Sequence, residues 1–379
     1  MSEPKTAMAV LIEPAPYMVQ LLEELKAQWC GAVHGWFLHP AITQRWEREE
    51  DSVLYGILPT ETARAIAKLW SEMRVARPAV VFVAGWRHPI VIAAIIMARL
   101  LGARVVSMSD TWTSDSQSFR AVLKRLVLKL MHAFTPGGSQ QARYLEAQGV
   151  PRTRIFPARM TSDIQAIRAF ITAEGPMHRA IRRKEMGSTD VDVVFIFVGR
   201  LEPVKGPDLL VDAFFSAQLS ENARLLIVGD GMMRNQIAAA AAGDPRILIR
   251  GRLEGKALWA EFAAADILVV PSRSEPWGLV INEAMGAGLT VLVHDCCGCI
   301  DDLVIDGSTG IVVRTGDATA LRHALGDLSR DPDRVAALRL SASKHIATWN
   351  TKAWASNIIE AWQATLSGHN LPKVEQDLI

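Results

Sequence analysis

Two glutamates that lie eight positions apart, Glu275 and Glu283, have a spacing that suggests chemistry. The apolar run at 266–271 predicts a buried strand, and the segment that begins at Gly278 predicts a helix. The first amides of a helix have no intrahelical partner and carry partial positive charge, so they could bind a phosphate. These amides belong to Gly278, Leu279 and Val280, and the glycine leaves room for close approach. Because carboxylates suit sugar hydroxyls, the loop predicts a site for a ligand with both groups, such as a nucleotide-sugar.

Two cations, Arg200 and Lys205, form the second candidate group. They follow an apolar strand predicted at 191–198 and precede a helix predicted to begin at Pro207. Positive side chains at this place could neutralise a diphosphate and stabilise the charge that grows on it as it departs. The alternative is an ordinary pair of surface cations.

Two further turns follow strands in the same half of the chain. Gly229 begins a Gly-Asp-Gly turn after a strand predicted at 223–228, although turn geometry alone could explain these glycines. Arg252 and Leu253 lie in the turn after the apolar residues 247–250. Neither turn by itself assigns a ligand.

In the first half of the chain, Asp110 follows a strand predicted at 103–108. Its carboxylate could hold a sugar or acceptor hydroxyl, or it could cap the next helix. His88 follows a strand predicted at 79–84 and is the other candidate for this contact. A lone loop histidine more often has a structural role or is merely exposed. The sequence does not decide between Asp110 and His88.

Strands and helices alternate along the chain, which predicts α/β domains with parallel sheets and ligand loops at the carboxyl ends of the strands. The length of 379 residues predicts two domains. The charge divides unevenly, because residues 1–189 hold 24 Lys and Arg and 16 Asp and Glu, whereas residues 190–379 hold 17 and 24. We expect a basic and an acidic domain to have different partners.

The sequence predicts no membrane span, since no run of about 18 uncharged apolar residues occurs. The first residues lack a signal-peptide pattern, and four cysteines indicate a reducing compartment, so we expect a cytoplasmic protein. A basic amphipathic helix predicted at 119–134 could lie on an anionic membrane surface, such as the inner face of the plasma membrane, or it could turn its apolar side to the core. The three thiols at 296–299 have no second pair or histidine partner, so we expect no metal site.

The segment from Glu275 to Glu283, together with the Gly199–Gly206 element, resembles the signatures of retaining GT-B glycosyltransferases of family 4. The resemblance covers nearly all of the chain and is most specific from about 195 to 315. It implies two Rossmann-like parallel-sheet domains that face a cleft, with a C-terminal helix that crosses back to the N-terminal domain. We therefore expect an acceptor-binding domain at 1–188, a nucleotide-sugar domain at 189–348, and the returning helix with a polar tail at 349–379.

The resemblance also implies roles for the candidate residues. Arg200 and Lys205 would bind the diphosphate with the amides of the 278–280 segment. Glu283 would hold the ribose, and Glu275 the transferred sugar. The turns at Gly229 and at Arg252 and Leu253 would lie against the nucleotide.

Two places depart from the family pattern. Asp110 stands where family members often carry a histidine that contacts the donor sugar. Pro14 and Pro16 stand where many members have a glycine-rich first loop. Both departures concern the first domain, where the family binds its acceptor.

The implied reaction transfers a hexosyl group from a nucleoside-diphosphate sugar to an acceptor hydroxyl, with retention and without a metal or cofactor. The expected partners are the donor, a glycan or lipid-linked acceptor from polysaccharide or glycolipid biosynthesis, and an anionic membrane surface, but no nucleic acid. Two alternatives share the fold: a sugar-nucleotide epimerase or phosphorylase, and a sugar-nucleotide-binding scaffold without catalysis.

Overall fold

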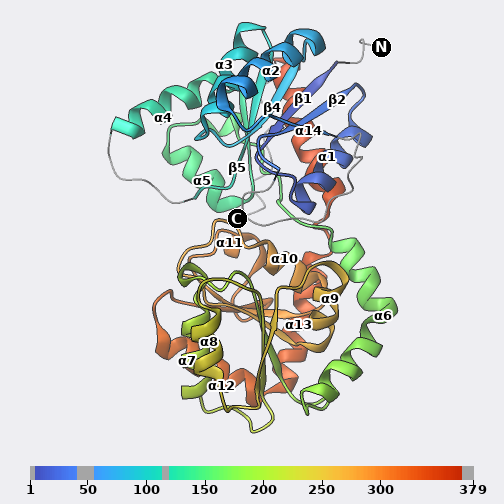
Figure 1. The fold of residues 1–379 in the computed structure, drawn as a ribbon, viewed down its shortest axis with the longest axis vertical. Coiled ribbons are helices and arrows are strands. Elements are labelled where there is room, and N and C mark those ends of the chain that lie inside the picture. The colour runs from blue at the N-terminus through green and yellow to red at the C-terminus, as the bar shows by residue number, and fades with distance from the viewer. Residues whose placement is uncertain (1–4, 41–54, 113–118, 369–379) are drawn as a thin grey trace. The chain divides into compact units, whose positions relative to one another are not determined.

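The computed structural model describes residues 5–40, 55–112 and 119–368 and divides them between two compact units (Figure 1). The first unit comprises Met1–Met160 with Thr351–Ile379, and the second comprises Thr161–Asn350. The sequence placed the divisions at 188/189 and 348/349. The polar tail after Gly368 lies outside the described residues.

A six-stranded parallel sheet forms the centre of the first unit. Its order is β3-β2-β1-β4-β5-β6, so the strand order reverses between β1 and β4. The strands are β1 (Ala7–Leu11), β2 (Val33–Phe37), β3 (Tyr55–Ile57), β4 (Val80–Ala84), β5 (Arg104–Ser109) and β6 (Ala133–Pro136). Strands β1 and β4 consist largely of buried apolar residues, as expected where helices cover both faces of a parallel sheet.

The helices of the first unit alternate with these strands and cover the sheet (Figure 1). They are α1 (Pro16–Gln28), α2 (Thr62–Ala76), α3 (Pro89–Leu100), α4 (Phe119–Leu130), α5 (Ser139–Ala147) and the returning helix α14 (Thr351–Ser367). The sequence predicted a helix through Phe134, but α4 ends at Leu130 and β6 begins at Ala133.

The last helix, α14, packs against α1 of the first unit, as predicted. Trp354 and Trp362 are completely buried in this contact. The ring of Trp354 stacks on Tyr17 with 6.4 Å between centroids, and Trp362 meets Trp29 edge-on at 5.3 Å. Two large aromatic side chains therefore anchor the helix, since each buries much apolar area in the unit that it joins.

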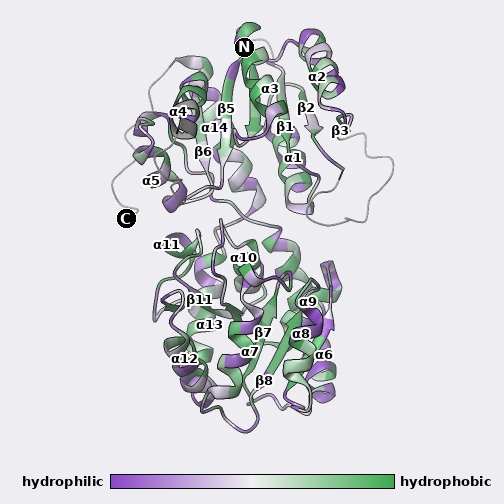
Figure 2. Ribbon diagram, turned by 60° about the vertical axis from the view of Figure 1, so that its left-hand side comes forward, coloured by the Kyte–Doolittle hydropathy of each residue, from purple (hydrophilic) through white to green (hydrophobic). Residues whose placement is uncertain are grey.

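The second unit repeats the architecture with its own six-stranded parallel sheet, ordered β12-β11-β10-β7-β8-β9. The strands are β7 (Val194–Val198), β8 (Arg224–Val228), β9 (Ile247–Gly251), β10 (Ile267–Val270), β11 (Thr290–His294) and β12 (Gly310–Val313). Figure 2 shows β7 and β8 in green, whereas the covering helix α6 carries many purple residues. In both units the chain order of the strands is 3-2-1-4-5-6, the Rossmann arrangement.

The helices of the second unit cover both faces of this sheet (Figure 1). They are α6 (Ile164–Glu185), α7 (Pro207–Ser216), α8 (Arg234–Ala241), α9 (Gly255–Ala264), α10 (Leu279–Gly286), α11 (Ile300–Leu303), α12 (Ala318–Arg330) and α13 (Pro332–Ile346). A short 3₁₀ turn, η2 (Pro203–Lys205), precedes α7. The described helices include none that combines the length and the apolar composition needed to cross a membrane.

A buried aspartate, Asp266, ties two of these helices to the start of the sheet. It accepts the amide of Val194 at 2.9 Å and the guanidinium groups of Arg179 at 3.1 Å and Arg339 at 2.8 Å. It also pairs with Arg183, which is only 2% exposed. Because α6 supplies Arg179 and Arg183 and α13 supplies Arg339, one carboxylate fixes both helices against β7 and β10.

Candidate active site

Five loops of the second unit leave its sheet at the carboxyl ends of β7 to β11, where open parallel sheets bind ligands. Backbone hydrogen bonds join the first three of them. The amide of Gly199 donates to Val228 at 3.0 Å, that of Leu201 to Asp230 at 2.9 Å, and that of Gly229 to Gly251 at 2.7 Å. These bonds make the loops after β7, β8 and β9 one connected rim.

Gly229 makes this rim possible. Its φ is 150°, and an added Cβ would lie 1.8 Å from the carbonyl oxygen of Gly199. No side chain fits at that separation, so only glycine allows the two backbones to approach so closely. The predicted Gly-Asp-Gly turn is therefore needed for packing, whatever it also contributes to a ligand.

Lys205 and Glu275 form an ion pair between the loop after β7 and the loop after β10. Their side chains are 22% and 10% exposed, so the pair is largely shielded from water. The contact follows from the sheet, because β10 lies directly beside β7. Two residues predicted from separate motifs thus meet through their charged atoms.

Arg273 holds these two loops together. Its guanidinium binds both carboxylate oxygens of Asp208, at 3.0 and 2.6 Å, and also the carbonyl of Pro203. Its own amide donates to the carbonyl of Val204 at 2.8 Å. The bidentate bond keeps the pKa of the Asp208 carboxyl below its usual range. This clamp was not predicted from the sequence, although an arginine and an acidic residue near the ends of two strands were present as signals.

The other predicted cations lie farther out on the rim. Arg200 is exposed and pairs with Glu202 at 2.8 Å, and Arg252 is exposed and pairs with Glu254 at 2.9 Å. Leu253 is half-buried in the same turn as Arg252. Arg200 therefore follows the same strand as Lys205 but has a different acidic partner.

The start of α10 has the predicted geometry of an anion site. Gly278 has a left-handed backbone with φ 99° and ψ 56°, and α10 begins at the next residue. The amide of Ile281 donates to Gly278 at 2.8 Å, so the first turn is closed. Across the described part of the chain, no acceptor is paired with the amides of Gly278, Leu279 and Val280. These donors are available to a ligand phosphate.

Glu283 lies on the second turn of α10. Burial raises the pKa of its carboxyl to about 7, because the charged form loses hydration there. Its surface is partly exposed, and no hydrogen-bond partner of its carboxylate is found among residues 5–40, 55–112 and 119–368. A carboxylate that is costly to ionise and lacks a protein partner is a candidate for ligand binding.

A series of hydrogen bonds between buried side chains fixes the position of α10. Trp277 is 3% exposed, and its indole nitrogen donates to the Asn282 side chain at 2.9 Å. The Asn282 amide in turn reaches Thr161 at 3.4 Å, and Trp277 packs beside Trp349 with 6.0 Å between ring centroids. These residues were not predicted from the sequence, since an Asn in a helix and a Trp in a loop carry no local signal that they share a hydrogen bond.

The loop after β11 supports Glu275 through its backbone. The amide of Gly298 donates to the Glu275 carbonyl at 3.0 Å. Cys297 and Cys299 are buried beside it, and the thiol of Cys296 donates to the Ser272 carbonyl at 2.9 Å. All three cysteines are free thiols and act as small packing residues.

Asp110 belongs to the first unit and follows β5. Its side chain is exposed. The pKa of the Tyr17 hydroxyl is raised mainly by the burial of Tyr17 and, to a smaller extent, by the negative charge of Asp110. His88 caps α3 by accepting the amide of Ile90 at 3.3 Å, and its other ring nitrogen lies 3.4 Å from His39. Burial and then His39 lower the pKa of His88. The capping bond matches the structural alternative for His88.

Two six-stranded parallel sheets in Rossmann order, with a last helix that returns to the first unit, define the GT-B fold. Solved structures agree with it along nearly the whole chain. The complex of HepE from Anabaena with UDP has a TM-score of 0.76 at 14% identity and covers 95% of this chain and 100% of that one. WaaG, a glycosyltransferase involved in lipopolysaccharide biosynthesis, has a TM-score of 0.68 at 17% identity, with 96% and 100% covered.

Residues 179–345, which lie within the second unit, match the family described as Glycosyl transferases group 1. The chain is 30% identical to a D-inositol 3-phosphate glycosyltransferase of Nocardia farcinica over 295 residues, 74% of this chain and 62% of that protein. It is 26% identical to the Streptomyces scabiei protein of the same name, over 96% of this chain and 78% of that one. The first of these matches thus spans less than two thirds of the relative.

Proposed function

We propose that this protein is a glycosyltransferase that moves a hexosyl group from a nucleoside-diphosphate sugar to an acceptor hydroxyl, with retention of the anomeric configuration. The observation that carries the proposal is the group formed by the Lys205–Glu275 ion pair, the amides at the start of α10 and Glu283, the last two without a hydrogen-bond partner in the described part of the chain. These groups match the parts of such a donor: a cation and amides for the diphosphate, and carboxylates for sugar hydroxyls.

In this proposal Lys205 and the amides of the 278–280 segment bind the diphosphate. Lys205 is already beside Glu275, so a phosphate oxygen would enter as a second acceptor for its ammonium group. Glu275 then accepts hydroxyl hydrogens of the transferred sugar. Arg200 lies on the same loop as Lys205 and would turn from Glu202 to the outer phosphate.

The Glu283 carboxylate would accept hydrogen bonds from the two ribose hydroxyls. None of the residues that the structure describes donates a hydrogen bond to its ionised form, so two hydroxyl donors from a ligand would replace the hydration lost through burial. The turns at Gly229 and at Arg252 and Leu253 would border the nucleotide. Asp110 in the first unit would hold an acceptor or sugar hydroxyl.

The positively charged diphosphate site would stabilise the negative charge that develops as the nucleoside diphosphate leaves. The departing phosphate itself can take the proton of the acceptor hydroxyl, so that the reaction proceeds without a metal ion or a protein base. Retention then follows from attack on the sugar face from which the diphosphate departs. The donor is a substrate, and no cofactor enters.

The acceptor class rests on weaker support. We propose a hydroxyl on a glycan or lipid-linked glycan, with the protein at the cytoplasmic surface of a membrane. The names of the relatives add a phosphorylated cyclitol to the acceptors worth testing, since several are D-inositol 3-phosphate glycosyltransferases.

A donor screen by thermal shift with UDP-, GDP- and ADP-sugars tests the proposal first. Release of nucleoside diphosphate is then measured with and without a panel of acceptors, and proton NMR of the product gives the anomeric configuration. Acceptor-dependent release with a retained anomer is expected. Interconversion of the free donor would indicate an epimerase, and donor binding without any turnover would indicate a scaffold.

A further inference from the structure

The loop after β11 places three thiols beside the proposed donor site. Cys297 forms an isolated parallel bridge with Glu275, and the next amide, that of Gly298, donates to the Glu275 carbonyl at 3.0 Å. Cys297 and Cys299 are completely buried, whereas Cys296 is partly exposed. Solvent can therefore reach one thiol of the cluster, and its neighbour in the chain pairs with the backbone of a site residue.

The surroundings of Cys296 stabilise its charged form. A hydrogen bond from the Cys297 thiol lowers the pKa of Cys296 to about 7, with help from Thr315 and against the effects of burial and Asp295. About half of the Cys296 side chains are thus thiolates at pH 7. The same hydrogen bond, together with burial, raises the pKa of Cys297, which keeps its proton. An accessible thiolate beside a second thiol is the arrangement typical of cysteines that undergo reversible oxidation.

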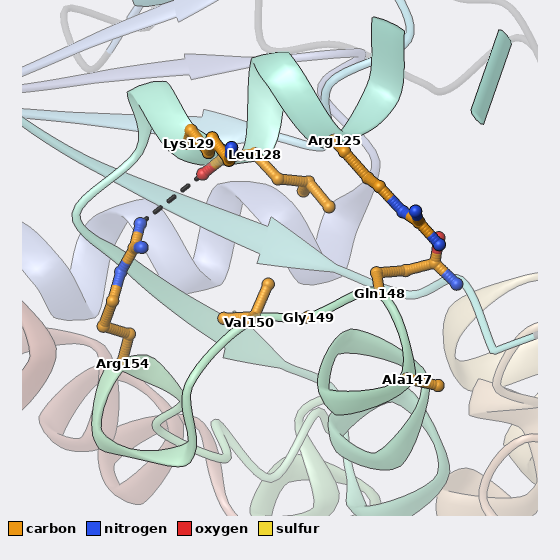
Figure 3. A pocket seen from close by; sticks show the side chains of 8 residues that line it. All are labelled: Arg125, Leu128, Lys129, Ala147, Gln148, Gly149, Val150 and Arg154. Atoms are coloured by element: carbon orange, nitrogen blue, oxygen red, sulfur yellow. Dashed lines mark hydrogen bonds between the residues drawn. The ribbon is translucent and has the colours of Figure 1, made fainter. Parts of the chain in front are cut away.

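The chemistry of this loop differs from that of the surface groove in the first unit (Figure 3). The polar side chains that line the groove are the charged Arg125, Lys129 and Arg154 and the amide of Gln148, none of which is a good nucleophile. A hydroperoxide transfers oxygen to a nucleophilic sulfur, and the thiolate is the reactive form of cysteine. Oxidation is therefore expected at Cys296 and not at that groove.

The reaction has two balanced steps. In the first, the Cys296 thiolate attacks one oxygen of a hydroperoxide, the O–O bond breaks, and the departing alkoxide or hydroxide takes a proton to give an alcohol or water. The sulfur is oxidised to a sulfenic acid and the peroxide is reduced. In the second, the sulfur of Cys297 attacks that of Cys296, the S–O bond breaks, and hydroxide leaves as water with the proton of the Cys297 thiol. The product is a disulfide between adjacent cysteines.

This disulfide cannot form without movement of the loop backbone. Consecutive Cα atoms lie about 3.8 Å apart across a trans peptide bond, whereas disulfides ordinarily join Cα atoms about 4.4 to 6.8 Å apart. The turn closed by the Cys297 amide and the His294 carbonyl, at 3.2 Å, therefore has to change. The Cys296 thiol must also leave the Ser272 carbonyl, to which it donates at 2.9 Å. Because Ser272 shares a loop with Glu275 and Cys297 pairs with Glu275, ring closure displaces this carboxylate.

We propose that Cys296 and Cys297 form a reversible disulfide through a sulfenic acid on Cys296, and that this disulfide switches off the site around Glu275. External thiols reverse it, since a disulfide with distorted geometry is readily reduced. The effect on turnover rests on the proposed function. The disulfide itself is detected without catalysis, so the two proposals can fail separately.

The chemical test treats the full chain with hydrogen peroxide and maps its peptides by mass spectrometry. Wild type should lose two hydrogen atoms from the peptide that holds Cys296 and Cys297, with a rate that is half-maximal near pH 7. Cys297→Ala should stop at the sulfenic acid, which dimedone traps, and Cys296→Ser should not form the disulfide. The matched control is Cys30→Ser, which removes an exposed cysteine of the first unit and should behave as wild type.

The functional test measures donor affinity by thermal shift and turnover on the same samples. A misplacement of about 1 Å in a group that positions substrate can cost about 100-fold in rate, and we expect a loss of this order in oxidised wild type and in oxidised Cys30→Ser. Dithiothreitol should restore both. Cys296→Ser keeps a hydroxyl donor for the Ser272 carbonyl, so it should turn over normally before and after peroxide. Circular dichroism of the reduced proteins establishes that each variant is folded.

Four results would overturn the inference. Wild type could form no disulfide in this loop, or its disulfide could join Cys299 or Cys30 instead. The disulfide could form and leave donor affinity and turnover unchanged. Peroxide could inactivate Cys296→Ser as fast as wild type, which would assign the effect to another group. Reduced wild type without any donor turnover would contradict the proposed function instead, and peptide mapping would still decide the chemistry of the loop.

Discussion

Replacement of Glu283 by glutamine should make the free protein more stable at pH 8 and make the donor bind less well. Burial raises the pKa of Glu283 to about 7 from its ordinary value of 4.5. Between pH 4.5 and about 7, the folded state therefore keeps a proton on Glu283 that the unfolded state has already released. Since folding then requires proton uptake, the free energy of unfolding falls as pH rises from about 4.5 to 7. Glutamine carries no charge and lacks this dependence.

The magnitude follows from the two pKa values. A difference of about 2.5 units, at 1.36 kcal/mol per unit, gives at most about 3 kcal/mol above pH 7. Partial exposure of the side chain makes this an upper limit. For a domain of this size, about 3 kcal/mol corresponds to a rise of roughly 6 to 12 °C in melting temperature. Below pH 4.5 both proteins are neutral at this position, so the difference should vanish.

The assay compares melting temperatures of wild type and Glu283→Gln at several pH values from 4 to 8. Glu221→Gln, which changes an exposed glutamate of the same unit, serves as the control and should show no such trend. Donor affinity is measured on the same samples. In wild type it should increase as pH rises through 7, because the ionised carboxylate accepts two hydroxyls, whereas in the variant it should be weak and independent of pH. A melting difference that is equal at pH 4 and pH 8 would refute the reasoning.

Four further outcomes are expected. Lys205→Ala should reduce turnover at least about 100-fold, because an electrostatic contact to the leaving group is lost, while the free energy of unfolding falls by only about 1 to 3 kcal/mol, the cost of leaving the largely shielded Glu275 carboxylate without this cation; normal turnover in this variant would contradict the site. Gly229→Ala should lower the free energy of unfolding by more than about 2 kcal/mol through its clash with Gly199, whereas Gly243→Ala, also at positive φ but with open space around it, should lose only about 1 kcal/mol. Asp266→Ala should be destabilising by about 3 to 5 kcal/mol, since it leaves Arg183 buried and uncompensated; a small effect in chemical denaturation would contradict the hub. Turnover should persist after dialysis against EDTA, and its loss with recovery on adding Mg²⁺ or Mn²⁺ would refute the metal-independent reaction.

Much of the fold was predictable because its strands appear in the sequence as short apolar runs that are followed by turn residues. The runs at β7, β8 and β10 are unmistakable, since both faces of a parallel sheet are covered. The error at 131–134 has the same origin. His132, Ala133 and Phe134 continue the apolar pattern of α4, and four residues of buried strand cannot be told from a last helical turn by periodicity alone.

The contacts of the site were harder to predict than its residues. Lys205 and Glu275 were identified because each follows a strand end, but their ion pair depends on β10 lying beside β7. Hydrophobic patterning gives the strands and not their order. The Arg273–Asp208 clamp and the Trp277–Asn282–Thr161 chain were missed for the same reason, since each joins loops or helices whose neighbours are set by the topology.

These contacts also explain why a carboxylate can remain unpaired at the start of α10. A single free carboxylate in a flexible loop would move toward water or toward a nearby cation. Here α10 is held by a buried asparagine, and Lys205 is already engaged by Glu275. The helix therefore keeps Glu283 in a poorly hydrated place with its pKa near 7. The rigidity that surrounds the site maintains an unfavourable charge in the free protein, and hydroxyl donors on a bound ligand would relieve it.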